Sequence, residues 1–140
     1  MELTNQQLSN DVLKSIFDAA FVTNELTENI LILRDDINFF IDWNNKQNRL
    51  TAATMFPIKN SASKEQCFEF CQRVNTDFSF IRAYIQAEED GVLWINFVQD
   101  LPVFDEQSIN AKTIVLFTRQ FQKLVIRCWK KAWGRVMQNG

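Results

Sequence analysis

The first apolar pattern in the chain has the period of an α-helix. Four apolar residues recur at intervals of four, and they are Leu8, Val12, Ile16 and Ala20. Residues with this spacing share one face, so they predict an amphipathic helix of about four turns. Thr4 and Gln7 have the spacing of a capping box, which satisfies two free backbone amides at a helix start. The helix is therefore predicted to begin beside them.

The pattern then changes to that of β-strands. Residues 29–33, 37–43 and 49–56 are rich in β-branched and aromatic side chains or alternate between two faces. The links between these runs are too short for a crossover helix, so three antiparallel strands are predicted. Pro57 lacks an amide hydrogen, which weakens strand pairing beyond that point.

A second helix is predicted after these strands. Ser63 and Gln66 repeat the capping box, and an apolar stripe with helical spacing extends from there to about Asn75. The stripe consists of Cys67, Phe70, Cys71 and Val74.

A hairpin is predicted from residues 80–87 and 92–98, which read as two strands joined by a short turn. Asp90 and Gly91 lie in that turn, where glycine accepts the positive φ that a chain reversal requires.

The last predicted helix has two apolar faces and one basic face. It is capped by Ser108 and reaches Ala132 or beyond, since no proline or glycine interrupts it. Its core face carries Ile114, Phe117, Phe121, Leu124, Val125, Cys128 and Ala132. The second apolar face includes Val115, Ile126, Trp129 and Trp133.

Two explanations fit the second apolar face. The helix is either buried on both sides within one domain, or this face meets another chain. Tryptophan is enriched at interface hot spots, and apolar patches rimmed by charge commonly mark partner sites. Symmetric dimers are the commonest oligomers. A homodimer interface is therefore predicted, with Val115, Ile126, Trp129 and Trp133 as its partner-binding residues.

Composition argues against catalysis. The 140 residues suit a single domain, 1–140, and include no histidine. Nucleophile systems that need an imidazole, and metal sites that contain one, are thereby excluded. The three glycines cannot form a glycine-rich phosphate loop. No catalytic residue, cofactor or small-molecule substrate is predicted, and the chain is not expected to be an enzyme.

The cysteines are predicted to be core residues. Cys67 and Cys71 share one helix face with apolar neighbours, and Cys128 lies elsewhere. A tetrahedral metal site needs four ligands, which three cysteines without histidine do not supply. An odd number of cysteines and the absence of a leader or membrane span favour a reducing, cytoplasmic location.

Charge is divided unevenly along the chain. The net charge is −2, yet all 17 acidic residues lie between Glu2 and Glu106, and none follows Gln107. The basic last helix could bind nucleic acid or an anionic membrane, with Trp129 and Trp133 as anchors. A pI near 5.2 opposes both, because the remaining acidic chain repels phosphates. Protein binding is the favoured function, and these two are its alternatives.

The order of elements resembles the YbjN family of bacterial proteins. The matching features are the second helix ending in Gln72-Arg73-Val74-Asn75, the turn at Asp90-Gly91, the segment Asp100-Leu101-Pro102-Val103 and the long last helix. The resemblance implies an α+β fold like that of type III secretion chaperones. In order, this fold has a helix, a three-strand antiparallel run, a second helix, a two-strand hairpin and a long C-terminal helix packed on the sheet. It also implies a chaperone-like or regulatory binding role in a bacterial cytoplasm, without catalytic residues.

Overall fold

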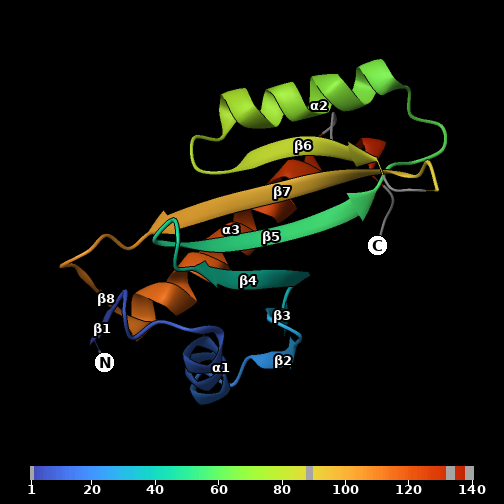
Figure 1. Ribbon diagram of the computed structural model, residues 1–140. Helices are drawn as coiled ribbons and strands as arrows, with labels where there is room; N and C mark the ends of the chain where they lie inside the picture. Colours follow the sequence, from blue (N-terminus) through green and yellow to red (C-terminus); the bar gives the residue numbers. More distant parts are fainter. Residues whose placement is uncertain (1, 88–89, 132–134, 138–140) are drawn as a thin grey trace. The chain divides into compact units, whose positions relative to one another are not determined.

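A computed structural model of the chain describes residues 2–87, 90–131 and 135–137, and Figure 1 shows its ribbon. The described chain combines helices with antiparallel strands. In order, its elements are β1 (Glu2–Thr4), α1 (Asn10–Ala19), β2 (Thr23–Thr27), β3 (Ile30–Arg34), β4 (Asn38–Asn44), β5 (Arg49–Pro57), α2 (Lys64–Asp77), β6 (Arg82–Ala87), β7 (Leu93–Pro102), β8 (Ser108–Asn110) and α3 (Ala111–Lys130). The predicted α+β class is confirmed.

The chain folds into two compact units. The first consists of Met1–Ala52 and Asp100–Gln122, and the second of Ala53–Gln99 and Lys123–Gly140. Strands β5 and β7 and helix α3 each begin in one unit and end in the other.

The first unit has the strand order β2-β3-β4-β5, and β3 pairs antiparallel with both β2 and β4. Alternate residues face its core, so the register that pairs Leu31 with Ile41 and Leu33 with Phe39 buries all four side chains. Helix α1 lies beside β2 and β3 (Figure 1). From α3, Phe121 packs on Phe39 with 5.7 Å between ring centroids.

The second unit has the strand order β5-β7-β6, with α2 beside β6 (Figure 1). Its core contains a cluster of aromatic rings, and Phe97 of β7 lies 6.0 Å from Phe56 and 5.9 Å from Phe70. The predicted hairpin is confirmed as β6 and β7, although β6 starts at Arg82 and β7 extends further than expected. Gly91 adopts a φ of +84° in the turn.

The first helix starts later than the sequence predicts. Thr4 and Gln7 do bond to each other, but they form a turn after β1. Helix α1 begins at Asn10, where the Ser9 hydroxyl accepts a hydrogen bond from the Val12 amide. The cause lies in the tertiary structure, because residues 2–4 pair with β8 and this pairing holds them in an extended conformation.

The last helix also starts later, because Ser108 belongs to strand β8. The cap is Asn110, whose side chain accepts a hydrogen bond from the Lys112 amide. Strands β1, β2 and β8 were not predicted, so the first run has four strands rather than three. The predicted end at Ala132 lies outside the described residues. The described residues of its predicted core face are buried as expected.

Candidate functional site

Val115 lines an open groove in the first unit. The groove has a volume of about 350 Å³ and lies between α1 and the first turns of α3. We call it the α1–α3 groove, and its lining consists of Ser15, Ile16, Ala19, Ala20, Ala111, Lys112 and Val115. Nearly all of this lining is apolar, so the groove suits an apolar side chain of another molecule. Leu116, the residue after Val115, is 50% exposed.

Phe21 adjoins this groove in sequence, directly after Ala20. The chain leaves α1 through a Schellman motif, in which the Phe21 amide donates to the Asp18 carbonyl and the Val22 amide to the Phe17 carbonyl. Phe21 occupies the left-handed position of that motif, with a φ of 59°. Glycine is usual there, because a side chain at positive φ clashes with the backbone.

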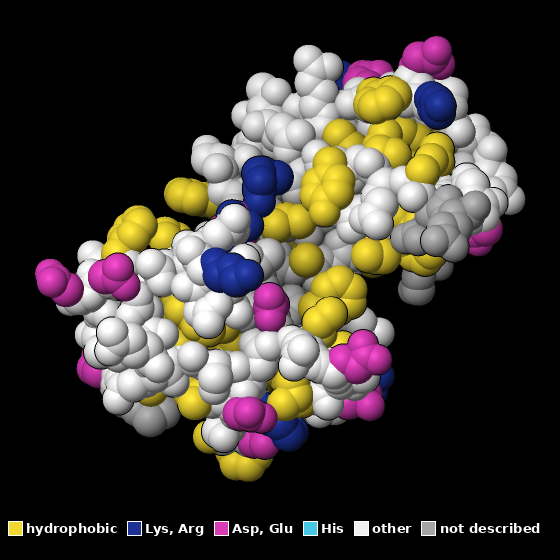
Figure 2. All heavy atoms as spheres, viewed as in Figure 1, with side chains coloured by type: hydrophobic (Ala, Val, Ile, Leu, Met, Phe, Trp, Pro, Cys, Tyr) yellow, Lys and Arg dark blue, Asp and Glu magenta, His cyan; other side chains and the backbone are white. Residues whose placement is uncertain are grey.

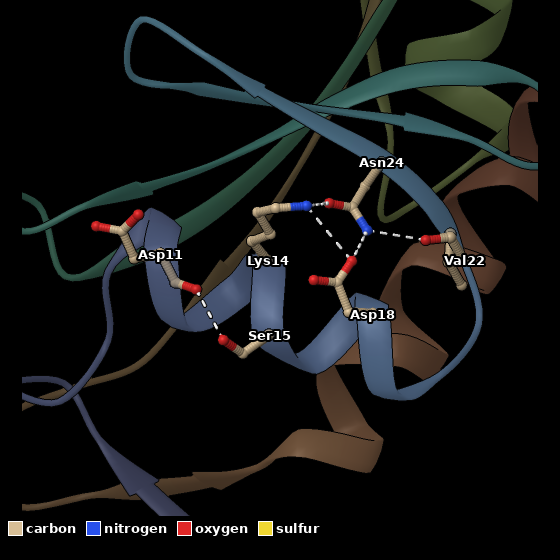
Figure 3. A network of polar contacts seen from close by, with 6 residues as sticks. All are labelled: Asp11, Lys14, Ser15, Asp18, Val22 and Asn24. Carbon is tan, nitrogen blue, oxygen red and sulfur yellow. Dashed lines mark hydrogen bonds and ion pairs between the residues drawn. The ribbon is translucent and has the colours of Figure 1, made fainter.

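A polar network holds the turn that presents Phe21, and Figure 3 shows it from close by. The Asn24 side-chain amide donates to the Asp18 carboxylate at 2.8 Å and to the Val22 carbonyl at 2.9 Å. Lys14 donates to the Asn24 carbonyl at 2.9 Å and pairs with Asp18 at 3.4 Å. The network ties α1 to the start of β2 across the turn between them.

The Asn24 hydrogen bond is the largest influence on Asp18 and lowers its pKa below the ordinary value of 3.8. Desolvation opposes this shift, and the charge and hydrogen bond of Lys14 add to it. Asn24→Ala is therefore expected to raise the pKa of Asp18. In the wild type, the Asp18 carboxylate stabilises the fold above its ordinary pKa, and this stabilisation is lost as the pH falls through the lowered value. NMR titration of the side-chain carboxyl carbon checks this, and an unchanged midpoint in Asn24→Ala contradicts it.

Phe21 is 96% exposed. Figure 2 shows that apolar side chains reach the surface in the region of α1, beside acidic and basic ones. Because the ring is almost fully in water, it contributes little to the core of the monomer, and its backbone conformation is unfavourable for phenylalanine. Neither packing nor backbone preference explains this residue, which makes it a candidate contact for another molecule.

Ile126 lies in a different setting, in the second unit. It is half-buried and lines a hollow of about 400 Å³ on the surface of α3. We call this the basic hollow, and its lining consists of Lys123, Ile126, Arg127, Lys130 and Lys131. The hollow combines one apolar side chain with four cations, so it differs in character from the α1–α3 groove.

Trp129 is half-buried and packs within the second unit. Its ring meets Phe56 of β5 edge-on, with 4.3 Å between centroids. This contact fits the explanation in which part of the second apolar face serves the fold itself. Trp133 lies outside the described residues. The three predicted residues that the structure describes thus occupy different surroundings: Val115 lines the groove, Ile126 lines the hollow and Trp129 makes an aromatic contact.

The thiols are buried, as the sequence predicts. Burial raises the pKa of Cys71 to about 11 and that of Cys128 to about 12, so both thiols stay protonated at neutral pH. Among the described residues, no group of three or more histidine, cysteine, aspartate or glutamate side chains is placed to hold a metal ion. No helix in the described part of the chain is long and apolar enough to cross a membrane.

Sequence reasoning missed Phe21 and Leu116. Phe21 follows Phe17 by four residues, so the helical period assigns it to the buried face of α1. The helix ends first, and the left-handed residue turns the ring outward. Without a glycine or asparagine at this position, the sequence carries no signal for that conformation.

The chain is similar to known proteins in sequence profile and in fold. The profile of the YbjN family, described as "Putative bacterial sensory transduction regulator", matches residues 9–128. The crystal structure of YbjN from E. coli, titled a "putative transcription regulator", has a TM-score of 0.73 at 17% identity, covering 86% of this chain and 88% of that one. No curated protein matches the sequence.

Two further solved structures share the fold. A protein from Methanothermobacter thermautotrophicus has a TM-score of 0.59 at 11% identity, covering 86% of this chain and 94% of that one. A chain of the HopA1-SchA chaperone-effector complex has a TM-score of 0.57 at 9% identity, covering 89% of this chain and 91% of that one. The fold is therefore the one that the sequence predicts. It is also the fold of YbjN and of a chain in the chaperone–effector complex.

Proposed function

The chain belongs to the YbjN family, and we propose that it is a non-enzymatic protein-binding module with a regulatory or chaperone-like role in a bacterial cytoplasm, acting as a homodimer. The family description names a regulator. The similar fold in the HopA1-SchA complex comes from an assembly of a chaperone with an effector. Both support a function exercised through another protein.

The exposed ring of Phe21 is the observation that carries this proposal. This phenylalanine is 96% exposed, so it adds no packing to the core. Its φ of 59° is a backbone conformation that is unfavourable for phenylalanine. Burial of its apolar area is favourable, and this requires a partner that removes the ring from water. The adjacent groove residues Ala19 and Ala20 extend the apolar surface beyond a single side chain.

A second copy of the chain suits this surface. Lys112 lines its α3 side, and Asp11 lies on α1 one turn before the lining residue Ser15, outside the lining itself. A two-fold axis places the same surface on both partners, so Lys112 of one copy can meet Asp11 of the other. The dimer of this proposal buries Phe21 and Val115 and keeps the rim charges paired.

Phe21→Gly tests the proposal by separating binding from stability. The variant is expected to weaken self-association by about tenfold or more, because it removes a central aromatic contact. Its free energy of unfolding stays level or rises by up to about 1 kcal/mol, because glycine accepts positive φ but adds entropy to the unfolded chain. Sedimentation equilibrium measures the first effect, and denaturant unfolding at concentrations where the chain is monomeric measures the second.

Glu28→Gly is the matched control. Glu28 also adopts a positive φ, 52°, so the substitution makes the same backbone change without removing apolar surface. It is expected to leave self-association unchanged. Equal self-association of wild type, Phe21→Gly and Glu28→Gly would rule out Phe21 as an interface residue.

A further inference from the structure

The basic hollow on α3 is preorganised by the fold. Ile126, Arg127 and Lys130 follow Lys123 by three, four and seven positions, so these four residues lie on one face of α3 over about 10 Å. Lys131 directly follows the end of the helix. The opposite side of the same turns carries Leu124, Val125 and Cys128, which are buried. The helix cannot rotate without exposing that core, and the cations are therefore held together.

The charge of the hollow is not balanced within the described chain. Lys123, Arg127, Lys130 and Lys131 form no ion pair with any residue in the ranges 2–87, 90–131 and 135–137. No acidic residue occurs in the sequence after Glu106. Cations four apart on a helix repel one another, and Lys123 and Arg127 of α3 have this spacing.

The helix dipole explains only part of this cluster. Cations in the last turn of a helix interact favourably with its carboxyl end, which accounts for Arg127 and Lys130. Lys123 lies two turns before the end of α3, where the dipole has little effect. Ile126, half-buried between the cations, adds an apolar floor that a purely solvated face does not need.

We propose that the basic hollow binds an acidic segment of a partner protein, one that carries an apolar side chain among its carboxylates. The four cations pair with carboxylates, while Ile126 and the lysine and arginine stems take the apolar side chain. The inference extends the proposed protein-binding function to a second surface. It rests on the proposed function only in taking the partner to be a protein.

The chemistry of the hollow favours this partner over two others. A second copy that presented the same face would bring eight cations together, which disfavours a symmetric contact here. Among the described residues, no aromatic side chain lines the hollow, although single-stranded nucleic acid is usually bound by stacking on such side chains. The net charge of −2 also gives a long polyanion no overall attraction.

Fluorescence anisotropy with a labelled Glu-Glu-Leu-Glu-Glu peptide tests the proposal on the full chain. The double variant Lys123→Gln/Arg127→Gln is expected to bind this peptide at least about tenfold more weakly than wild type. The matched control is Lys64→Gln/Arg119→Gln, which lowers the net charge by the same amount with exposed residues outside the hollow. It is expected to change binding by less than about twofold. Circular dichroism verifies that each variant is folded.

Three results would overturn the proposal. The first is no peptide binding to wild type at millimolar concentration. The second is an equal loss in both double variants, which would reduce the effect to net charge. The third is tighter binding of a labelled oligothymidylate of about 20 nucleotides than of the peptide, lost in the hollow variant, which would assign the hollow to phosphates. Equal binding of a Glu-Glu-Ser-Glu-Glu peptide would remove Ile126 from the site.

Failure here is distinguishable from failure of the proposed dimer. The hollow variant keeps Phe21 and Val115, so its self-association is expected to equal that of wild type. A peptide result that contradicts the hollow leaves the Phe21 measurement unaffected, and the reverse also holds.

Discussion

Phe97→Ala is expected to lower the free energy of unfolding by about 3–5 kcal/mol. Phe97 is fully buried in the second unit, and its ring meets Phe56 and Phe70 edge-on at interplanar angles of 70° and 89°. Truncation removes both aromatic contacts and leaves a cavity between a strand and a helix that cannot close without moving the backbone. Urea denaturation followed by tryptophan fluorescence measures the change.

Phe80→Ala is the control for this experiment. Phe80 is 74% exposed, so its truncation is expected to change the free energy of unfolding by about 0.5 kcal/mol or less. Similar losses for Phe80→Ala and Phe97→Ala would contradict the assignment of Phe97 to the core.

Gln122→Leu is expected to cost about 1–3 kcal/mol, although leucine has a similar size and greater hydrophobicity. Gln122 is 1% exposed on α3. Its side-chain carbonyl accepts a hydrogen bond from the Ile37 amide at 3.2 Å, and its amide donates to the Asp35 carboxylate at 3.0 Å. Asp35 is exposed and regains water in the variant, but leucine leaves the half-buried Ile37 amide without its acceptor. The desolvation cost of that amide outweighs the gain in apolar burial.

Gln120→Leu provides the comparison, because Gln120 is exposed on the same helix. This change is expected to stay within about 0.5 kcal/mol. Thermal unfolding of both variants in the same buffer measures the difference in their stability. A Gln122→Leu protein as stable as Gln120→Leu would show that the two hydrogen bonds contribute nothing.

Elements with local signals were predicted from the sequence. The capping box of α2 forms as expected, with Ser63 and Gln66 satisfying each other's backbone amides. The turn of the β6–β7 hairpin also depends on neighbouring residues, Asp90 and Gly91. In both cases the interacting groups are within a few positions, so the pattern and its structural cause coincide.

Elements that depend on distant partners were missed. Strands β1 and β8 are three residues each, and Leu3 pairs with Ile109 across more than 100 positions. The Thr4–Gln7 pair has the same spacing as the box at Ser63, yet it forms a turn, because the residues before it are fixed by that pairing. Local propensity did not decide the outcome at this position.

The candidate site was predicted only in part. Helical periodicity placed Val115 and Ile126 away from the core face, and both line surface hollows. Periodicity could not reveal that Phe56 of a distant strand covers part of Trp129. Nor could it reveal the outward turn of Phe21, which depends on where α1 ends. Both features arise from tertiary structure, which a residue's sequence neighbours do not determine.

Self-association through an apolar surface is tested by sedimentation equilibrium of the wild-type chain at low and high salt. A dimer of twice 16.5 kDa is expected at both salt concentrations, because salt does not weaken apolar burial. A dimer at low salt that dissociates at high salt would indicate a contact between charged surfaces instead. A monomer at both would contradict the claim outright.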